Sequence, residues 1–136
     1  MNLVVDTNRI IASLIKNSVA RRILTSQSLH FYAPEYSIIE IEKYEELIRN
    51  KGNFTHNEFE TLLAILLDSI TIVPQDEYRD KLSQARKYIE DADDVVFIAV
   101  ALAKYISGIW TDDAHFHSTE YYIVYRTKDL LFTLKE

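Results

Sequence analysis

This sequence of 136 residues has no cysteine, only two glycines and two prolines, and no long uninterrupted apolar run. Without cysteine, neither a disulfide framework nor a thiolate metal site can form, which is compatible with the cytoplasmic location that we expect. The scarcity of glycine and proline favours regular helices and strands joined by short loops. No apolar stretch is long enough to cross a bilayer, and Met1 leads into a short strand rather than a signal peptide, so we expect no membrane partner.

An excess of basic residues is lacking as well, because the formal net charge is -6. This charge does not suggest a nonspecific nucleic-acid coat. It fits a concentrated acidic site, although acidic surfaces also serve solubility. A hydrophobic content of 48% and this length predict one domain over residues 1–136, with enough chain for a real core.

Short apolar strands are expected to alternate with helices along the chain. The predicted strands are residues 3–5, 29–33, 70–73, 108–111 and 121–124. The predicted helices are residues 7–27 with a break near Asn17, 37–48, 55–68 with a capping box from Thr55 to Glu58, 76–90, 91–106 and 127–134. Short buried strands that alternate with helices imply an α/β fold, with a parallel sheet covered by helices on both faces.

Acidic residues stand where predicted strands end or predicted helices begin. They are Asp6, Glu40, the group Asp91, Asp93 and Asp94, and the pair Asp112 and Asp113. Ligands of open α/β sheets bind at the carboxyl ends of the strands, where Asp6 and Asp113 are expected. Converging carboxylates are what a hard divalent cation such as Mg²⁺ or Mn²⁺ requires. The pattern therefore indicates metal-assisted phosphoryl chemistry.

Each of these acids also has a structural explanation. Asp6 is suited to cap the helix that follows it, and Asp113 is suited to build a turn. Glu40 follows Ser37 at the spacing of a capping box, which would explain Glu40 completely.

Asp91, Asp93 and Asp94 precede the apolar body of the buried helix, and acids at a helix start interact favourably with the helix dipole. Three acids are nevertheless more than a cap requires. Like charges this close repel one another, and a cation would relieve that repulsion. Asp94 is nearest the apolar body of the helix and is expected to lie innermost. Thr111 offers a hydroxyl to a water or a phosphate oxygen.

The histidines His115 and His117 suggest zinc only weakly. They stand two residues apart without cysteine or further histidines at a suitable spacing, whereas closed zinc sites usually have four matched ligands. The nine tyrosines are typical of core and surface packing rather than of stacking platforms.

An ordered set of segments resembles the PIN-domain nucleases. It comprises VVDTN, a glutamate early in the helix after the second strand, DADDVVFIAVALA and WTDDAHF, and it covers almost the whole chain. The segment APEYSIIEIEKYEELI is similar to prokaryotic members, among them the ribonuclease toxins of the VapC type. The resemblance implies a three-layer α/β/α fold with a five-stranded parallel sheet in the order 3-2-1-4-5. It also implies an Mg²⁺- or Mn²⁺-dependent ribonuclease, often the toxin of a toxin–antitoxin pair.

Carried over by motif, the resemblance assigns metal-binding and catalytic roles to Asp6, Glu40, Asp94 and Asp113. The supporting polar residues that it implies are Asn8 and Thr111, with Asp93 as the candidate that could replace Asp94 if the third motif slips by one residue.

We therefore expect an endoribonuclease that hydrolyses RNA phosphodiester bonds and leaves a 5′-phosphate and a 3′-hydroxyl. Attack by the ribose 2′-hydroxyl is disfavoured, because no His/His or His/Lys pair is evident as acid and base. The expected partners are an RNA substrate, a protein antitoxin and a second copy of the chain. The apolar residues Val19, Ile23 and Leu24 of the second helix favour a homodimer, but the sequence does not indicate which surface dimerises.

Two alternatives stay open. One is a haloacid-dehalogenase-like phosphatase with Asp6 as nucleophile, which usually needs a second aspartate where this chain has Asn8. The other is a non-catalytic PIN-like module that binds RNA or a protein.

Overall fold

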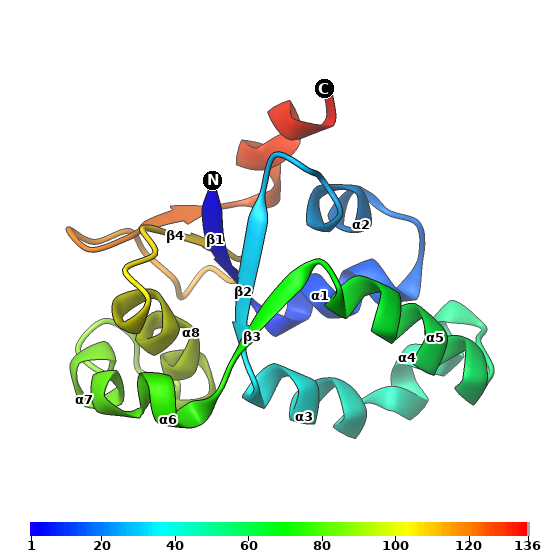
Figure 1. Cartoon of the computed structure of the whole chain (residues 1–136), viewed down its shortest axis with the longest axis horizontal. Helices are drawn as coiled ribbons and strands as arrows, with labels where there is room; N and C mark the ends of the chain where they lie inside the picture. Colours follow the sequence, from blue (N-terminus) through cyan, green and yellow to red (C-terminus); the bar gives the residue numbers. More distant parts are fainter. Residues whose placement is uncertain (136) are drawn as a thin grey trace.

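Five short parallel strands form the centre of the molecule in the computed structural model, which describes residues 1–135 (Figure 1). Along the sheet the order is β3-β2-β1-β4-β5, and every neighbouring pair is parallel. The strands are β1 (Asn2–Val5), β2 (His30–Pro34), β3 (Ile70–Val73), β4 (Gly108–Trp110) and β5 (Ile123–Tyr125). The predicted fold class and strand order are confirmed. Residue 136 of the predicted domain range lies outside the described residues.

Helices cover both faces of the sheet (Figure 1). One face carries α1 (Thr7–Ile15), α2 (Val19–Leu24), α3 (Tyr36–Lys43), α4 (Glu45–Gly52) and α5 (His56–Leu67), and the other carries α6 (Gln75–Tyr78), α7 (Leu82–Ala85) and α8 (Ala92–Ala103). Two 3-10 segments, η1 (Arg79–Lys81) and η2 (Thr127–Lys135), complete the chain. In β1, Leu3 and Val5 pack into the first apolar cluster and Val4 into the second. Side chains alternate along a strand, so this apolar run is buried on both sides.

Several predicted helix boundaries are confirmed. The break near Asn17 separates α1 from α2. The helix predicted to end at residue 48 continues in α4 to Gly52, where Asn53, with a φ of 58°, ends it. The capping box of α5 has both hydrogen bonds, from the backbone N–H of Glu58 to Thr55 Oγ1 (3.1 Å) and from the backbone N–H of Thr55 to Glu58 Oε1 (2.9 Å). Local capping chemistry therefore fixes the start of this helix.

Three predicted helices differ from the structure. The helix over 37–48 is divided at Tyr44, and the closing helix is of the 3-10 type. The helix over 76–90 is divided into α6, η1 and α7. Its apolar residues Tyr78, Ala85 and Ile89 are all buried in the cluster that contains α8. Packing these anchors against α8 outweighs the local helical preference of the polar residues between them.

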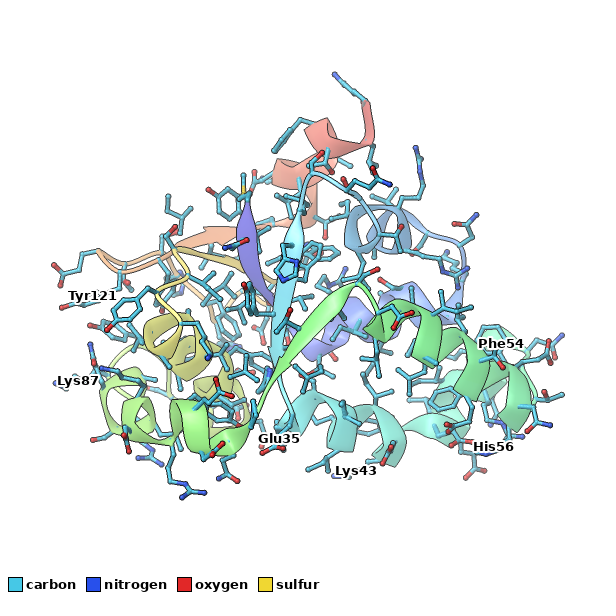
Figure 2. The ribbon with its side chains drawn as sticks, in the orientation of Figure 1. Glu35, Lys43, Phe54, His56, Lys87 and Tyr121 are labelled. Carbon is cyan, nitrogen blue, oxygen red and sulfur yellow. The ribbon has the colours of Figure 1, made fainter. Side chains whose placement is uncertain are left out.

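The parallel strands bring their carboxyl ends to one edge of the sheet, where the following helices begin. Beyond the strands, the N–H of Asp6 donates to the carbonyl of Trp110 (3.0 Å), and the N–H of Glu35 donates to the carbonyl of Val73 (3.0 Å). Glu35 lies between α3 and α6 at this edge (Figure 2). None of the helices in residues 1–135 combines the length and apolar character needed to span a membrane.

Candidate functional site

Asp6 is a buried carboxylate at the junction of β1 and α1, with only 5% of its surface exposed. Its Oδ2 accepts a hydrogen bond from the hydroxyl of Thr111 (2.7 Å), so the carboxylate is turned toward the end of β4 rather than used as a cap for α1. Burial raises the pKa of Asp6, although the Thr111 hydrogen bond acts in the opposite direction. Asp6 occupies the N-cap position of α1 without a side-chain hydrogen bond of capping geometry, and the backbone N–H of Asn8 also lowers its pKa. A buried carboxylate is costly unless something compensates it.

Glu40 is held by α1 rather than by a capping box. Helix α3 begins at Tyr36 after the N-cap Glu35, which places Ser37 inside the first turn, and the Ser37–Glu40 capping-box alternative is wrong. Instead, Thr7 Oγ1 lies 2.8 Å from Ser37 Oγ and donates to Glu40 Oε1 at 2.8 Å. Burial raises the pKa of Glu40, and the nearby charge of Asp6 adds to this effect.

The three acids at the start of α8, Asp91, Asp93 and Asp94, each have a different environment. Asp91 is the N-cap, because its Oδ1 accepts a hydrogen bond from the backbone N–H of Asp93 (2.9 Å). The carboxylate of Asp93 accepts a hydrogen bond from the hydroxyl of Tyr36 on α3 (3.0 Å). Burial, together with the charges of Asp113, Asp91 and Asp6, raises the pKa of Asp94 to about 7. Asp94 is therefore the member of this group that is half-buried beside other carboxylates.

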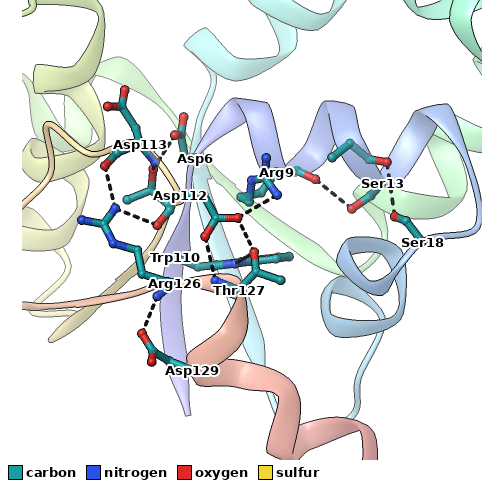
Figure 3. Close-up of polar contacts among 12 residues, drawn as sticks. Asp6, Arg9, Ser13, Ser18, Trp110, Asp112, Asp113, Arg126, Thr127 and Asp129 are labelled. Atoms are coloured by element: carbon teal, nitrogen blue, oxygen red, sulfur yellow. Dashed lines mark hydrogen bonds and ion pairs between the residues drawn. The ribbon is translucent and has the colours of Figure 1, made fainter.

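The adjacent residues Asp112 and Asp113 point in opposite directions (Figure 3). Asp113 Oδ1 accepts from the backbone N–H of His115 (2.9 Å), which is the turn that the sequence suggested, and also lies 3.0 Å from Nδ1 of the same residue. The carboxylate of Asp112 forms an ion pair with Arg9 (3.0 Å) and accepts from the N–H and hydroxyl of Thr127 (2.8 and 2.5 Å). Asp112 is thus used in the packing of α1 against η2, and Asp113 is directed toward the other acids.

A groove of about 430 Å³ opens beside these carboxylates. Its acidic side is lined by Glu40, Asp91, Asp93, Asp94 and Asp113 with Asn8, and its other side by Ile11, Ile15, Tyr44, Leu47, Ile48 and Lys51. A smaller hollow of about 240 Å³ shares Asn8 and Asp113 with the groove and reaches Asp6. The four acids predicted from the sequence therefore lie around Asn8 and Asp113 at one edge of the sheet.

These acids suit a hard cation by their chemistry and by the scarcity of cationic side chains in direct contact with them. In the described chain, no lysine or arginine nitrogen lies within 4.0 Å of a carboxylate oxygen of Asp6, Glu40, Asp94 or Asp113. Asp113 has the ring of His115 as a neighbour, with 3.0 Å between its Oδ1 and Nδ1. A group of four carboxylates at a partly buried edge fits Mg²⁺ or Mn²⁺.

The carboxylates are nevertheless more widely spaced than in a closed metal site. Within residues 1–135, only Glu45, His56 and Glu60 bring three potential ligand atoms within 4.8 Å of one another. That surface group was not predicted, and His56 lies at the outer end of α5, away from the strands (Figure 2). The predicted acids are like charges, which repel one another when no cation lies between them.

The sequence indicated Thr111 as a supporting residue, but two other hydroxyl groups that orient the acids, those of Thr7 and Tyr36, were not predicted. Thr7 stands between Asp6 and Asn8 in the DTN segment, and this position was the available signal for it. The contact between Tyr36 and Asp93 joins residues 57 positions apart, so no local pattern indicates it.

Comparisons with known proteins agree with this architecture. A structural likeness with a TM-score of 0.64 and 16% sequence identity is found to a chain in the crystal structure of VapBC2 from Rickettsia felis bound to a DNA fragment from their promoter. It covers 93% of this chain and 98% of that chain, and at this identity it shows the fold alone. No curated protein sequence matches this chain. The sequence model described as PIN domain matches residues 4–129. Because that match extends over nearly all of the sequence, the protein belongs to the PIN-domain family.

Proposed function

We propose that this protein is a metal-dependent endoribonuclease that hydrolyses RNA phosphodiester bonds. The observation that carries the proposal is the group of partly buried carboxylates, unpaired with lysine or arginine, at the carboxyl edge of a PIN-domain sheet. Such a group is costly for a protein that uses it only for stability, because each charge raises the cost of ionising its neighbours.

Asp6 and Asp113 would hold Mg²⁺ or Mn²⁺ directly, and Glu40 and Asp94 would complete the ligand set or hold the waters of the cation. Asp94 is favoured over Asp93 for this role because it is half-buried beside Asp113, whereas Asp93 is exposed. Bound there, the cation would activate water and neutralise charge on the phosphate.

The remaining polar groups orient these acids. The hydroxyl of Thr111 fixes the carboxylate of Asp6, and the hydroxyl of Thr7 fixes the carboxylate of Glu40. Asn8 lines both the groove and the smaller hollow, so it is placed to contact a phosphate or a water between them. Ligand orientation of this kind is what keeps a site productive.

In the proposed reaction, the oxygen of a water attacks the phosphorus in line with the 3′-oxygen. The bond between phosphorus and the 3′-oxygen breaks, and the 3′-oxygen takes a proton. The products are a 5′-phosphate and a 3′-hydroxyl. The acidic groove repels RNA by itself, so substrate binding also depends on the cation.

The test is an assay of the purified protein with Mn²⁺ on a mixed pool of short RNAs and, separately, on p-nitrophenyl phosphate. Cleavage of RNA inside the chain supports the proposal. Turnover of p-nitrophenyl phosphate without RNA cleavage selects the phosphatase alternative. Binding of RNA without turnover of either substrate selects the non-catalytic module.

A protein antitoxin is the proposed partner. The structural neighbour from Rickettsia felis is a VapBC2 complex bound to promoter DNA, and this chain shares its fold. An adjacent reading frame that encodes a small DNA-binding protein with a flexible tail would support a toxin–antitoxin pair in the cytoplasm. Co-purification of the two proteins, with loss of RNA cleavage in the complex, is the measurement that checks it.

A homodimer is expected, although the apolar helix residues that favoured it are mostly buried. Ile23 and Leu24 lie in the core, which leaves Val19, 41% exposed, as the accessible member of the three. The expectation therefore rests on the family resemblance. Light scattering should give twice the mass of the chain, and a monomer at high concentration would contradict it.

Glu40→Gln should separate a site role from a structural one. Glutamine still accepts the hydrogen bond from Thr7 but removes a charge that lies near Asp6 and Asp93. We expect the melting temperature without metal to be unchanged or higher, and RNA cleavage to fall by at least about tenfold. A lower melting temperature with full activity would mean that Glu40 contributes to stability and not to RNA cleavage.

Addition of Mn²⁺ should stabilise the folded protein, because a cation that binds only the native state adds free energy by mass action. At a free concentration 100 times Kd this is about 2.7 kcal/mol, or a rise in melting temperature of roughly 10 °C for a domain of this size. Asp6→Asn should respond less and should be no less stable than the parent without metal, since the substitution removes a buried charge. An unchanged response in Asp6→Asn would exclude Asp6 as a ligand.

A further inference from the structure

The loop that carries Asp113 receives three hydrogen bonds from a single side chain, Arg126, which follows the neighbouring strand β5. We propose that Arg126 is a positioning residue, which fixes the loop over residues 111–116 and thereby sets the place of Asp113 relative to the other acids. The inference rests on the proposed function and assigns a residue that neither the sequence motifs nor the carboxylate pattern indicated.

The guanidinium of Arg126 donates hydrogen bonds to three backbone carbonyls of this loop. Nη1 donates to the carbonyls of Thr111 (3.1 Å) and Asp113 (2.6 Å), and Nη2 donates to the carbonyl of Phe116 (2.7 Å). The three carbonyls bracket Asp113 on both sides. They lie beyond Trp110, where β4 ends, so the strand ladder does not supply their partners. The carbonyl of Asp113 also accepts from the backbone N–H of Phe116 (3.2 Å).

Arg126 is itself fixed by the chain around it (Figure 3). It follows β5 directly, and its backbone N–H donates to Asp129 Oδ2 (2.8 Å). The next residue, Thr127, donates to Asp112 through both its N–H and its hydroxyl, and accepts from Trp110 Nε1 (3.2 Å). The arginine therefore extends from a rigid base onto an irregular loop.

The loop needs these hydrogen bonds from Arg126 because Asp113 lies among like charges. Asp113 lines one groove with Glu40 and Asp94 and a smaller hollow with Asp6, and carboxylates gathered in this way repel one another. A loop without regular structure would relax by moving Asp113 outward. The hydrogen bonds from Arg126 oppose that movement without placing a cation within 4.0 Å of the carboxylate itself.

Lysine cannot replace arginine in this contact. The guanidinium presents five N–H donors in a flat, rigid fork, so it can reach carbonyls that point toward it from several residues. An ammonium is one compact group at the end of a flexible chain. Arg126→Lys therefore keeps the positive charge and removes most of the hydrogen bonds to the loop carbonyls.

The test compares Arg126→Lys with Arg21→Lys. Arg21 makes the same kind of contact away from the site, since its Nε and Nη2 donate to the carbonyls of Ser13 (2.7 Å) and Leu14 (3.3 Å). The measurements are the Kd for Mn²⁺ by calorimetry, kcat and KM for RNA cleavage, and the melting temperature. A second variant, Arg126→Ala, is assayed with and without dilute guanidinium chloride, and Arg21→Ala is its control.

We expect Arg126→Lys to weaken Mn²⁺ binding and to lower kcat, each by about 10- to 100-fold, as loss of an orienting partner does. KM should change little, and Arg21→Lys should alter the melting temperature alone. Dilute guanidinium should restore part of kcat in Arg126→Ala and have no such effect on Arg21→Ala.

The proposal is overturned if Arg126→Lys matches Arg21→Lys in Mn²⁺ affinity and kcat. It is also overturned if neither Arg126 variant folds, because Arg126 is then a residue of the fold. If the parent protein neither binds Mn²⁺ nor cleaves RNA, the proposed function itself fails, and this outcome is seen before any variant is compared.

Discussion

Asp113→Asn and Asp6→Asn are each expected to lower the rate of RNA cleavage by about 100-fold or more. Both substitutions keep the size of the side chain and remove one negative charge from the edge where the carboxylates gather. The hydrogen bond from Thr111 shows that Asp6 is held in one orientation, and the turn at His115 does the same for Asp113. An amide in either place would hold a cation less well, and a displaced cation misplaces the phosphate.

Single-turnover cleavage at saturating Mn²⁺ measures this effect apart from substrate binding. Asp80→Asn is the matched control, because Asp80 is an exposed aspartate in η1 with no part in the groove. Circular dichroism and melting curves establish that each variant is folded. Wild-type rates in Asp113→Asn would remove Asp113 from the site, and with it the proposed reason for the hydrogen bonds from Arg126.

Asp112→Asn gives a sharper contrast, because Asp112 is the direct neighbour of Asp113 and points the other way. Its ion pair with Arg9 is partly exposed, so its loss should cost about 0.2–1 kcal/mol of stability. The rate should fall far less than in Asp113→Asn. Equal losses of rate in the two variants would mean that charge anywhere in the loop matters, rather than a carboxylate directed at the site.

The sheet and the meeting of the four acids followed from the sequence because both depend on simple repeated features. Short apolar runs indicate buried parallel strands, and carboxylates that follow such runs come to the same edge. The resemblance to the PIN-domain nucleases supplied the strand order. Asp6, Glu40, Asp94 and Asp113 therefore lie near one another although they span more than 100 positions.

The predictions that were wrong depended on the exact residue at which a helix begins and on how its side chains pack. The Ser37–Glu40 capping box required the helix to begin after Ser37, but α3 begins at Tyr36, and the two side chains meet Thr7 instead. Helix boundaries are the least certain part of such predictions, and a shift of two residues changes the role of every side chain in the first turn.

Hydrogen bonds between a side chain and a backbone group far away in the sequence could not be predicted from any sequence pattern. The hydrogen bonds of Arg126 depend on the register of β5 beside β4, which pairs Trp110 with Tyr125. A backbone carbonyl carries no residue identity, so no pattern of residue types marks the loop as a partner for arginine. Positioning residues of this class are found only once the strands have been placed.

Removal of divalent cations should abolish RNA cleavage, and the end groups of the product should identify the nucleophile. We expect EDTA to reduce cleavage to background and Mg²⁺ or Mn²⁺ to restore it, because in the proposed site the four carboxylates would supply ligands for the cation. Attack by water leaves a 5′-phosphate and a 3′-hydroxyl, whereas attack by the ribose 2′-hydroxyl leaves a 2′,3′-cyclic phosphate. Mass spectrometry of the fragments distinguishes the two.

The groove favours attack by water. Attack by the 2′-hydroxyl needs a base and an acid on the two sides of the phosphate. Among the described residues that line the groove there is no histidine. His115 and His117 line a separate cavity that shares Asp91 with the groove, and His115 is hydrogen-bonded to Asp113. An RNA with a single 2′-deoxy or 2′-methoxy sugar at the cleavage position should therefore still be cut, more slowly where sugar contacts are lost. Failure to cut that substrate, together with a cyclic phosphate end or with cleavage that survives EDTA, would overturn the mechanism while leaving ribonuclease activity in place.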